Sequence, residues 1–141
     1  MRVFLDADAS PVKKLVEDIC EEQKVECIFV HDDCHEIKTR YAKEVVVGQG
    51  KNAADDVIVE LSRRDDVVIS GDFGLLERIV DKGCMGITSY GQIVDNVNNV
   101  KSKEHKKYKD KDRNRFDRNF RELLMKNYSM QSFTYSLQCS F

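Results

Sequence analysis

The sequence contains no apolar run of about 18 residues, the length that a membrane-spanning helix requires. Met1 leads directly into Arg-Val-Phe-Leu-Asp, without the charged and apolar segments that make up a signal peptide. The five cysteines follow no repeating interval, which favours reduced thiols over a disulfide framework. We therefore expect a cytoplasmic protein that has no membrane partner.

Charged residues are plentiful but unevenly distributed. Residues 1–100 carry 12 Lys/Arg against 20 Asp/Glu, whereas residues 101–141 carry 11 against 5. An acidic body can hold metal ions, and a basic extension can bind phosphates by releasing counterions. A solvated helix whose charges only maintain solubility explains the basic part equally well. The nucleic-acid contacts predicted in this part are Lys103, Lys106, Lys107 and Lys109.

The pattern of apolar residues predicts an α/β fold. Short apolar segments at 2–5, 25–30, 44–47, 67–70 and 85–88 are typical of buried strands. Ser10-Pro11 indicates a helix start, and apolar residues recur at helical spacing over 53–63, 75–81 and 112–127. This order predicts a three-layer α/β/α domain over residues 1–100 with a mainly parallel, five-stranded sheet. Residues 101–141 are predicted to extend it as a basic arm and an amphipathic helix.

Aspartates follow the predicted strands at one edge of the sheet. Asp6 and Asp8 follow the first strand, Asp72 follows the fourth, and Asp55 and Asp56 open the helix after the third. Parallel sheets bind ligands at the carboxyl ends of their strands. Clustered carboxylates repel one another unless cations lie between them, and oxygen ligands with few histidines favour Mg²⁺ or Mn²⁺. Such ions promote phosphodiester hydrolysis. Helix capping is the competing interpretation, and it suits Asp56 best.

Three segments carry a resemblance to a known family: residues 6–12 (DADASPV), 50–55 (GKNAAD) and 67–75 (VVISGDFGL), followed by Lys82-Gly83. In order and spacing they resemble the YaiI/YqxD family of bacterial proteins, which is assigned to the PIN-like superfamily. The resemblance covers residues 1–100, and more loosely 115–124. It implies a PIN-like fold and a Mg²⁺- or Mn²⁺-dependent nuclease acting on RNA or DNA.

The resemblance also implies residue roles. Asp6, Asp55 and Asp72 match the catalytic carboxylates of PIN-like nucleases, and together with Asp8 they are the predicted metal ligands. Asp55 is preferred to Asp56 because its spacing to Ile58 resembles the signature of the PIN helix.

Other residues are predicted to contact the substrate. His35 falls where the family tends to hold a histidine, and His35, Lys51 and Ser70 are the predicted substrate contacts.

Two positions depart from the sequence patterns of related proteins. Gly74 stands where flap-type relatives of the PIN fold place a second aspartate. It is therefore open whether the site holds one metal ion or two. Ser10 stands where the family commonly has cysteine, which argues against thiol chemistry there.

Two other functions are compatible with the sequence. One is a non-catalytic nucleic-acid-binding or assembly module that keeps the PIN-like fold, with the basic arm as its contact surface. The other is an aspartate-nucleophile phosphatase, because Asp6-x-Asp8 after a first strand also matches the haloacid-dehalogenase-like motif. That fold needs a flap insertion downstream, and here a helix is predicted to start at once. The choice between RNA and DNA, the cleavage position and the oligomeric state stay open.

Overall fold

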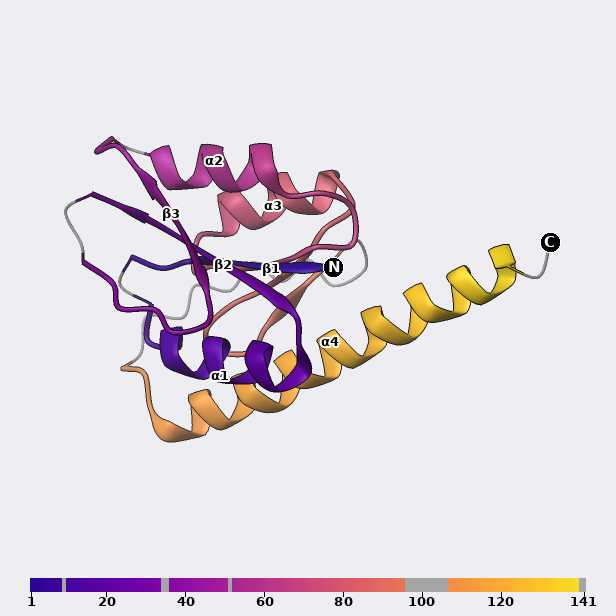
Figure 1. Cartoon of the computed structure of the whole chain (residues 1–141). Coiled ribbons are helices and arrows are strands. Elements are labelled where there is room, and N and C mark those ends of the chain that lie inside the picture. Colours follow the sequence, from indigo (N-terminus) through magenta and orange to yellow (C-terminus); the bar gives the residue numbers. More distant parts are fainter. Residues whose placement is uncertain (9, 34–35, 51, 96–106, 140–141) are drawn as a thin grey trace.

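A computed structural model describes residues 1–8, 10–33, 36–50, 52–95 and 107–139, with side chains in the last range as far as Lys126. The strands are β1 (Arg2–Asp6), β2 (Glu26–Asp32), β3 (Lys43–Val47), β4 (Val67–Ile69), β5 (Met85–Ile87) and β6 (Ile93–Val94). The helices are α1 (Lys13–Gln23), α2 (Ala53–Leu61), α3 (Phe73–Asp81) and α4 (Asp110–Cys139). The predicted α/β class is confirmed (Figure 1).

The strands form one sheet in the order β3-β2-β1-β4-β5-β6. Every neighbouring pair from β3 to β5 is parallel, as predicted, whereas β6 pairs antiparallel with β5. The prediction of five strands is therefore wrong by one. β6 has only two residues, which is too short to produce a recognisable period in the sequence. From β1 the chain moves outward through β2 and β3, then returns to place β4 on the other side of β1.

The two faces of the sheet bury different side chains because successive residues of a strand point to opposite sides. Val3 and Leu5 of β1 face one cluster, which includes apolar residues of α1 and α4. Phe4 faces the other cluster, which includes apolar residues of α2 and α3. Helices thus cover both faces, with α1 and α4 on one and α2 and α3 on the other (Figure 1).

Helix α1 begins at Lys13, later than Ser10-Pro11 suggests, because Pro11 and Val12 form a turn before it. The last helix is longer than predicted and runs to Cys139, past the body of the molecule (Figure 1). Its first half packs on the domain through Phe116, Phe120, Leu123 and Leu124, all buried. None of the described helices combines the length and apolar character needed to cross a bilayer.

Candidate metal centre

The sheet topology brings the carboxyl ends of β1 and β4 together. The strands that follow β1 in sequence are first added on one side of it, as β2 and β3, and then on the other side, from β4 onward. Such a switch in strand order is where open α/β sheets form their binding crevice. Asp6 is the last residue of β1, and Ser70 directly follows β4. Asp6 and Ser70 each come two residues after a side chain, Phe4 or Val68, that faces α2 and α3. Because side chains alternate along a strand, Asp6 and Ser70 point to that same face and meet there.

Ser70 connects the two strand ends. Its side chain is buried, with 3% exposed, and its hydroxyl donates to Asp6 Oδ2 at 3.2 Å. The same Oγ accepts the backbone N–H of Asp72 at 3.0 Å. A single buried hydroxyl therefore fixes the Asp6 carboxylate relative to the turn that carries Asp72.

Asp72 is the N-cap of α3. Its Oδ1 accepts the backbone N–H groups of Gly74 at 2.8 Å and Leu75 at 3.3 Å. The capping interpretation therefore holds for Asp72, and its carboxyl group also shares a hydrogen bond with Asp55. A Cβ at Gly74 would lie 3.1 Å from Asp72 Oδ1, so a side chain at this position would crowd the cap.

Asp55 and Asp56 both lie in the first turn of α2 but face different partners. Asp55 is partly buried and faces Asp72 and Asp6. Asp56 is exposed and forms an ion pair with Arg78 Nη1 at 3.0 Å. These two side chains do not face one site, since adjacent helical residues point about 100° apart.

The remaining aspartates complete what we call the acidic recess, defined by Asp6, Asp8, Asp32, Asp55 and Asp72. Two adjoining hollows of about 200 and 270 Å³ share Asp6 and Asp8; the first also meets Asp32 and Asp55, and the second meets Asp72. The backbone N–H of Asp32 donates to Asp8 Oδ2 at 3.3 Å. Asp32 was not among the predicted site residues, although it too ends a strand, β2.

Burial and the nearby carboxylates together raise two pKa values in the acidic recess. Burial raises the pKa of Asp6, and the charges of Asp8 and Asp72 raise it further against the Ser70 hydrogen bond. Burial, the hydrogen bond to Asp72 and the charges of Asp72 and Asp6 raise the pKa of Asp55 to about 6. Among the described residues, none of Asp6, Asp55 and Asp72 forms an ion pair with Lys or Arg. The negative charge of Asp6, Asp55 and Asp72 is thus not paired with a Lys or Arg side chain of the described residues.

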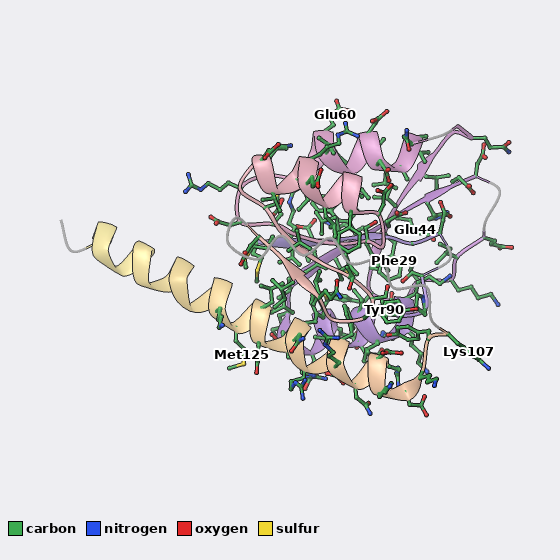
Figure 2. All side chains as sticks on the ribbon, turned by 180° about the vertical axis from the view of Figure 1, so that it is seen from behind. Phe29, Glu44, Glu60, Tyr90, Lys107 and Met125 are labelled. Carbon is green, nitrogen blue, oxygen red and sulfur yellow. The ribbon has the colours of Figure 1, made fainter. Side chains whose placement is uncertain are left out.

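The carboxylates are close but do not yet enclose a metal position. In the part of the chain that the structure describes, no three His, Cys, Asp or Glu side chains are grouped so that they could hold a metal ion. The predicted residues His35, Lys51, Lys103 and Lys106 lie outside the described residues. Lys107 and Lys109 are exposed just before α4, and Lys107 points away from the body (Figure 2).

Comparisons with known proteins agree with the resemblance that the three segments suggest. The family model described as "Uncharacterized BCR, YaiI/YqxD family" matches residues 4–99. A UPF0178 protein of Clostridium tetani is 38% identical over 70% of this chain and 67% of its own length. Another, of Clostridium acetobutylicum, is 29% identical over 89% of this chain and 98% of its own length. No solved structure matches the chain.

Proposed function

This chain belongs to the YaiI/YqxD family, and we propose that it is a Mg²⁺- or Mn²⁺-dependent nuclease with a PIN-like arrangement of its layers. Its reaction would be the hydrolysis of phosphodiester bonds in RNA or DNA. The observation that carries the proposal is the convergence of Asp6, Asp8, Asp55 and Asp72 on one recess at the switch point of the sheet. Structural capping alone explains only Asp72, because Asp6 and Asp8 cap no helix.

The chemistry of these donors fits a hard divalent cation. All four side chains offer carboxylate oxygens, the ligands that Mg²⁺ and Mn²⁺ prefer. The repulsion that raises the pKa of Asp6 and Asp55 would be relieved by a cation placed between them. A bound cation would favour the ionised form of Asp55, and the side chains would turn inward to enclose the ion.

Each residue of the recess has a role in this proposal. Asp6, Asp55 and Asp72 would be the catalytic carboxylates and, with Asp8, would hold the cation. A bound Mg²⁺ or Mn²⁺ would polarise the phosphodiester and lower the pKa of the attacking water. Ser70 would act as a positioning residue, because its hydroxyl already joins Asp6 to the Asp72 turn. Asp32 lines the same recess and is a further candidate carboxylate.

Other groups would favour the anionic substrate. The N-termini of α2 and α3 carry Asp55 and Asp72, and helix N-termini attract phosphate through their partial positive charge. We propose that His35 and Lys51 contact the substrate and that Lys103, Lys106, Lys107 and Lys109 add contacts along the nucleic acid.

The test is metal-dependent cleavage of single-stranded RNA and DNA by the purified chain. We expect cleavage with Mn²⁺ or Mg²⁺, none with EDTA, and loss of activity of at least about 100-fold in Asp6→Asn and Asp55→Asn. Asp56→Asn is the matched control, because this neighbour faces Arg78 instead, and it should retain cleavage. Cleavage that survives both Asp6→Asn and Asp55→Asn would refute the proposal.

The same assay separates the two alternatives. Metal binding and nucleic-acid binding without cleavage would favour the non-catalytic module. An aspartate-nucleophile phosphatase would release phosphate from monoesters and form a phosphoryl group on Asp6, which a phosphate mimic would trap. Neither result is expected here.

A further inference from the structure

A large hollow lies beside the acidic recess, not in it. It measures about 640 Å³ and lies between the start of α1 and the segment 36–40 that precedes β3. Ser10 and Pro11 line both this hollow and the part of the recess that holds Asp6, Asp8 and Asp72. The two cavities therefore adjoin along the turn before α1.

The two cavities carry opposite charge. The larger one is lined by Lys13, Lys14, Lys38 and Arg40, and its acidic lining residues are Glu17, Asp18 and Glu36. Two of these acids are already engaged. Glu17 Oε2 accepts the backbone N–H groups of residues 40–42, each at 2.9 Å, and Asp18 pairs with Arg40 at 2.7 Å. With four basic and three acidic side chains, the lining has a small excess of positive charge, and Lys13, Lys14 and Lys38 supply the cations other than Arg40.

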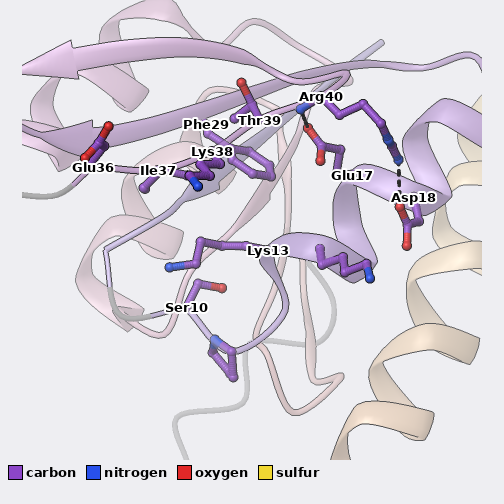
Figure 3. Close-up of a pocket in the computed structure, with 12 residues that line it drawn as sticks. Ser10, Lys13, Glu17, Asp18, Phe29, Glu36, Ile37, Lys38, Thr39 and Arg40 are labelled. Atoms are coloured by element: carbon purple, nitrogen blue, oxygen red, sulfur yellow. Dashed lines mark hydrogen bonds and ion pairs between the residues drawn. The ribbon is translucent and has the colours of Figure 1, made fainter.

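Lys13 and Lys38 approach the hollow from opposite walls. Lys13 projects from α1 near Ser10, while Lys38 lies above it beside the Phe29 ring (Figure 3). Within the described residues neither ammonium group forms an ion pair. Ser10 Oγ accepts the Val12 N–H at 3.3 Å, which leaves its hydroxyl proton available to donate. Two ammonium groups and a hydroxyl thus face one space, a donor set suited to a phosphate oxyanion.

The wall that carries Lys38 is held in place. Glu17 binds the backbone of residues 40–42, and the Tyr41 hydroxyl donates to the Val25 carbonyl at 2.8 Å. Burial alone would raise the pKa of Glu17, but the three N–H groups and the charge of Arg40 hold it below the usual value. Glu17 is therefore ionised at neutral pH and keeps the segment after Lys38 docked on α1.

We propose that Lys13 and Lys38 form a phosphate-binding subsite for a single-stranded polynucleotide whose neighbouring phosphodiester lies at the acidic recess. This inference rests on the proposed function for its substrate. The recess repels phosphate when no cation is bound, so attraction must come from a flanking surface. A hollow of about 640 Å³ is larger than a phosphate needs and has room for a nucleotide unit of the strand.

The test measures binding without metal, so that it does not depend on cleavage. A fluorescein-labelled single strand of about 12 nucleotides is titrated with the full chain in EDTA, and anisotropy gives the affinity. We expect Lys13→Ala/Lys38→Ala to weaken binding about tenfold or more. The slope of log affinity against log salt should fall by about 0.7 for each phosphate that the variant no longer neutralises. Lys13→Arg/Lys38→Arg should bind like the wild type, because charge is kept.

The matched control removes two cations at the other end of the sheet. Arg63 and Arg64 lie exposed just before β4, and Arg63→Ala/Arg64→Ala should leave affinity within about twofold of the wild type. Acetylation footprinting of the wild type should show Lys13 and Lys38 protected by the oligonucleotide. The inference would be overturned by any of three results: both alanine pairs weaken the affinity equally, the oligonucleotide does not protect Lys13 and Lys38 from acetylation, or the wild type does not bind the oligonucleotide. None of these results decides the outcome of the metal-dependent cleavage assay, so the subsite and the proposed nuclease activity are tested separately.

Discussion

Asp55 and Asp56 are neighbours in sequence, but their different surroundings give their carboxyl groups different properties. Asp55 has a pKa of about 6 because it is partly buried and lies beside two other carboxylates, whereas exposed Asp56 is paired with Arg78. A carboxyl pKa raised above its unfolded value means that the folded state binds the proton more tightly. Its contribution to stability is therefore present at low pH and declines as pH rises through about 6.

We predict that Asp55→Asn raises the free energy of unfolding at pH 8 by roughly 1 kcal/mol, after allowance for solvent screening. Asparagine removes the repelling charge and can still donate a hydrogen bond to Asp72. Urea denaturation without metal measures the change, and the gain should shrink at pH 5. Asp56→Asn should give no gain because it loses an attractive pair. A destabilised Asp55→Asn at pH 8 would show that the carboxylates do not repel one another.

At this scale the sequence predicts the types of residue but not their contacts. Asp6 and Asp72 could be placed at strand ends because strand endings are local signals. The hydroxyl of Ser70 that joins them, and the hydrogen bond of Asp55 to Asp72, depend on the strand order. Asp32 was missed because β2 continues two residues beyond the predicted end, Val30, through a His-Asp pair that does not look apolar.

Between elements, the contact of α1 with the segment before β3 is made by one carboxylate. Glu17 is buried in the face of α1 and accepts three backbone N–H groups through a single oxygen. Its pKa is depressed, so its stabilising contribution is present above the unfolded value of about 4.5. That contribution is lost as pH falls through the folded pKa.

We predict that Glu17→Gln lowers the free energy of unfolding at pH 7 by about 2 kcal/mol, the order expected for hydrogen bonds to a charged group. The difference from the wild type should decrease below pH 4.5, where the wild-type carboxylate takes up its proton. Urea denaturation between pH 3 and 7 measures both quantities. Glu21→Gln is the control, because exposed Glu21 pairs with the Arg40 side chain at 3.3 Å and accepts none of the three backbone N–H groups that Glu17 binds. A constant difference across this range would contradict the assignment.

Element boundaries were predicted best where the apolar pattern is strong. The parallel strands are such cases, and each observed strand lies within two residues of its predicted bounds. Helix α4 beyond residue 127 was not predicted, since its sequence alternates polar and aromatic residues without a helical stripe. The antiparallel β6 was missed because pairing with β5, not its own two residues, makes it a strand.

For the whole molecule, the basic C-terminal part is joined to the sheet domain through one core. Buried Phe116 and Phe120 of α4 belong to the same cluster as β1 and α1. Arg121 Nη1 also pairs with Glu22 of α1 at 2.8 Å, and Asn119 Nδ2 donates to the Gly91 carbonyl at 2.8 Å. The start of α4 is therefore expected to unfold together with the sheet.

We predict that Phe120→Ala lowers the free energy of unfolding of the whole chain by about 3 to 5 kcal/mol, because it leaves a cavity in this core. Circular dichroism and tyrosine fluorescence should report one coincident urea transition in the wild type. Met125→Ala on the same helix is the control: Met125 is 64% exposed (Figure 2), and its removal should cost less than about 0.5 kcal/mol. Two separate transitions in the wild type would indicate independent units.

The central claim is that the acidic recess holds a divalent cation, and a crystal soaked in Mn²⁺ tests it most directly. Anomalous scattering locates manganese without any assumption about activity. We expect a peak in the acidic recess, within about 2 to 2.5 Å of carboxylate oxygens of Asp6, Asp55 and Asp72. The peak should be absent in Asp6→Asn crystals soaked in the same way. A soaked wild-type crystal with no peak in this recess, or with peaks only elsewhere, would show that these carboxylates do not form a cation site.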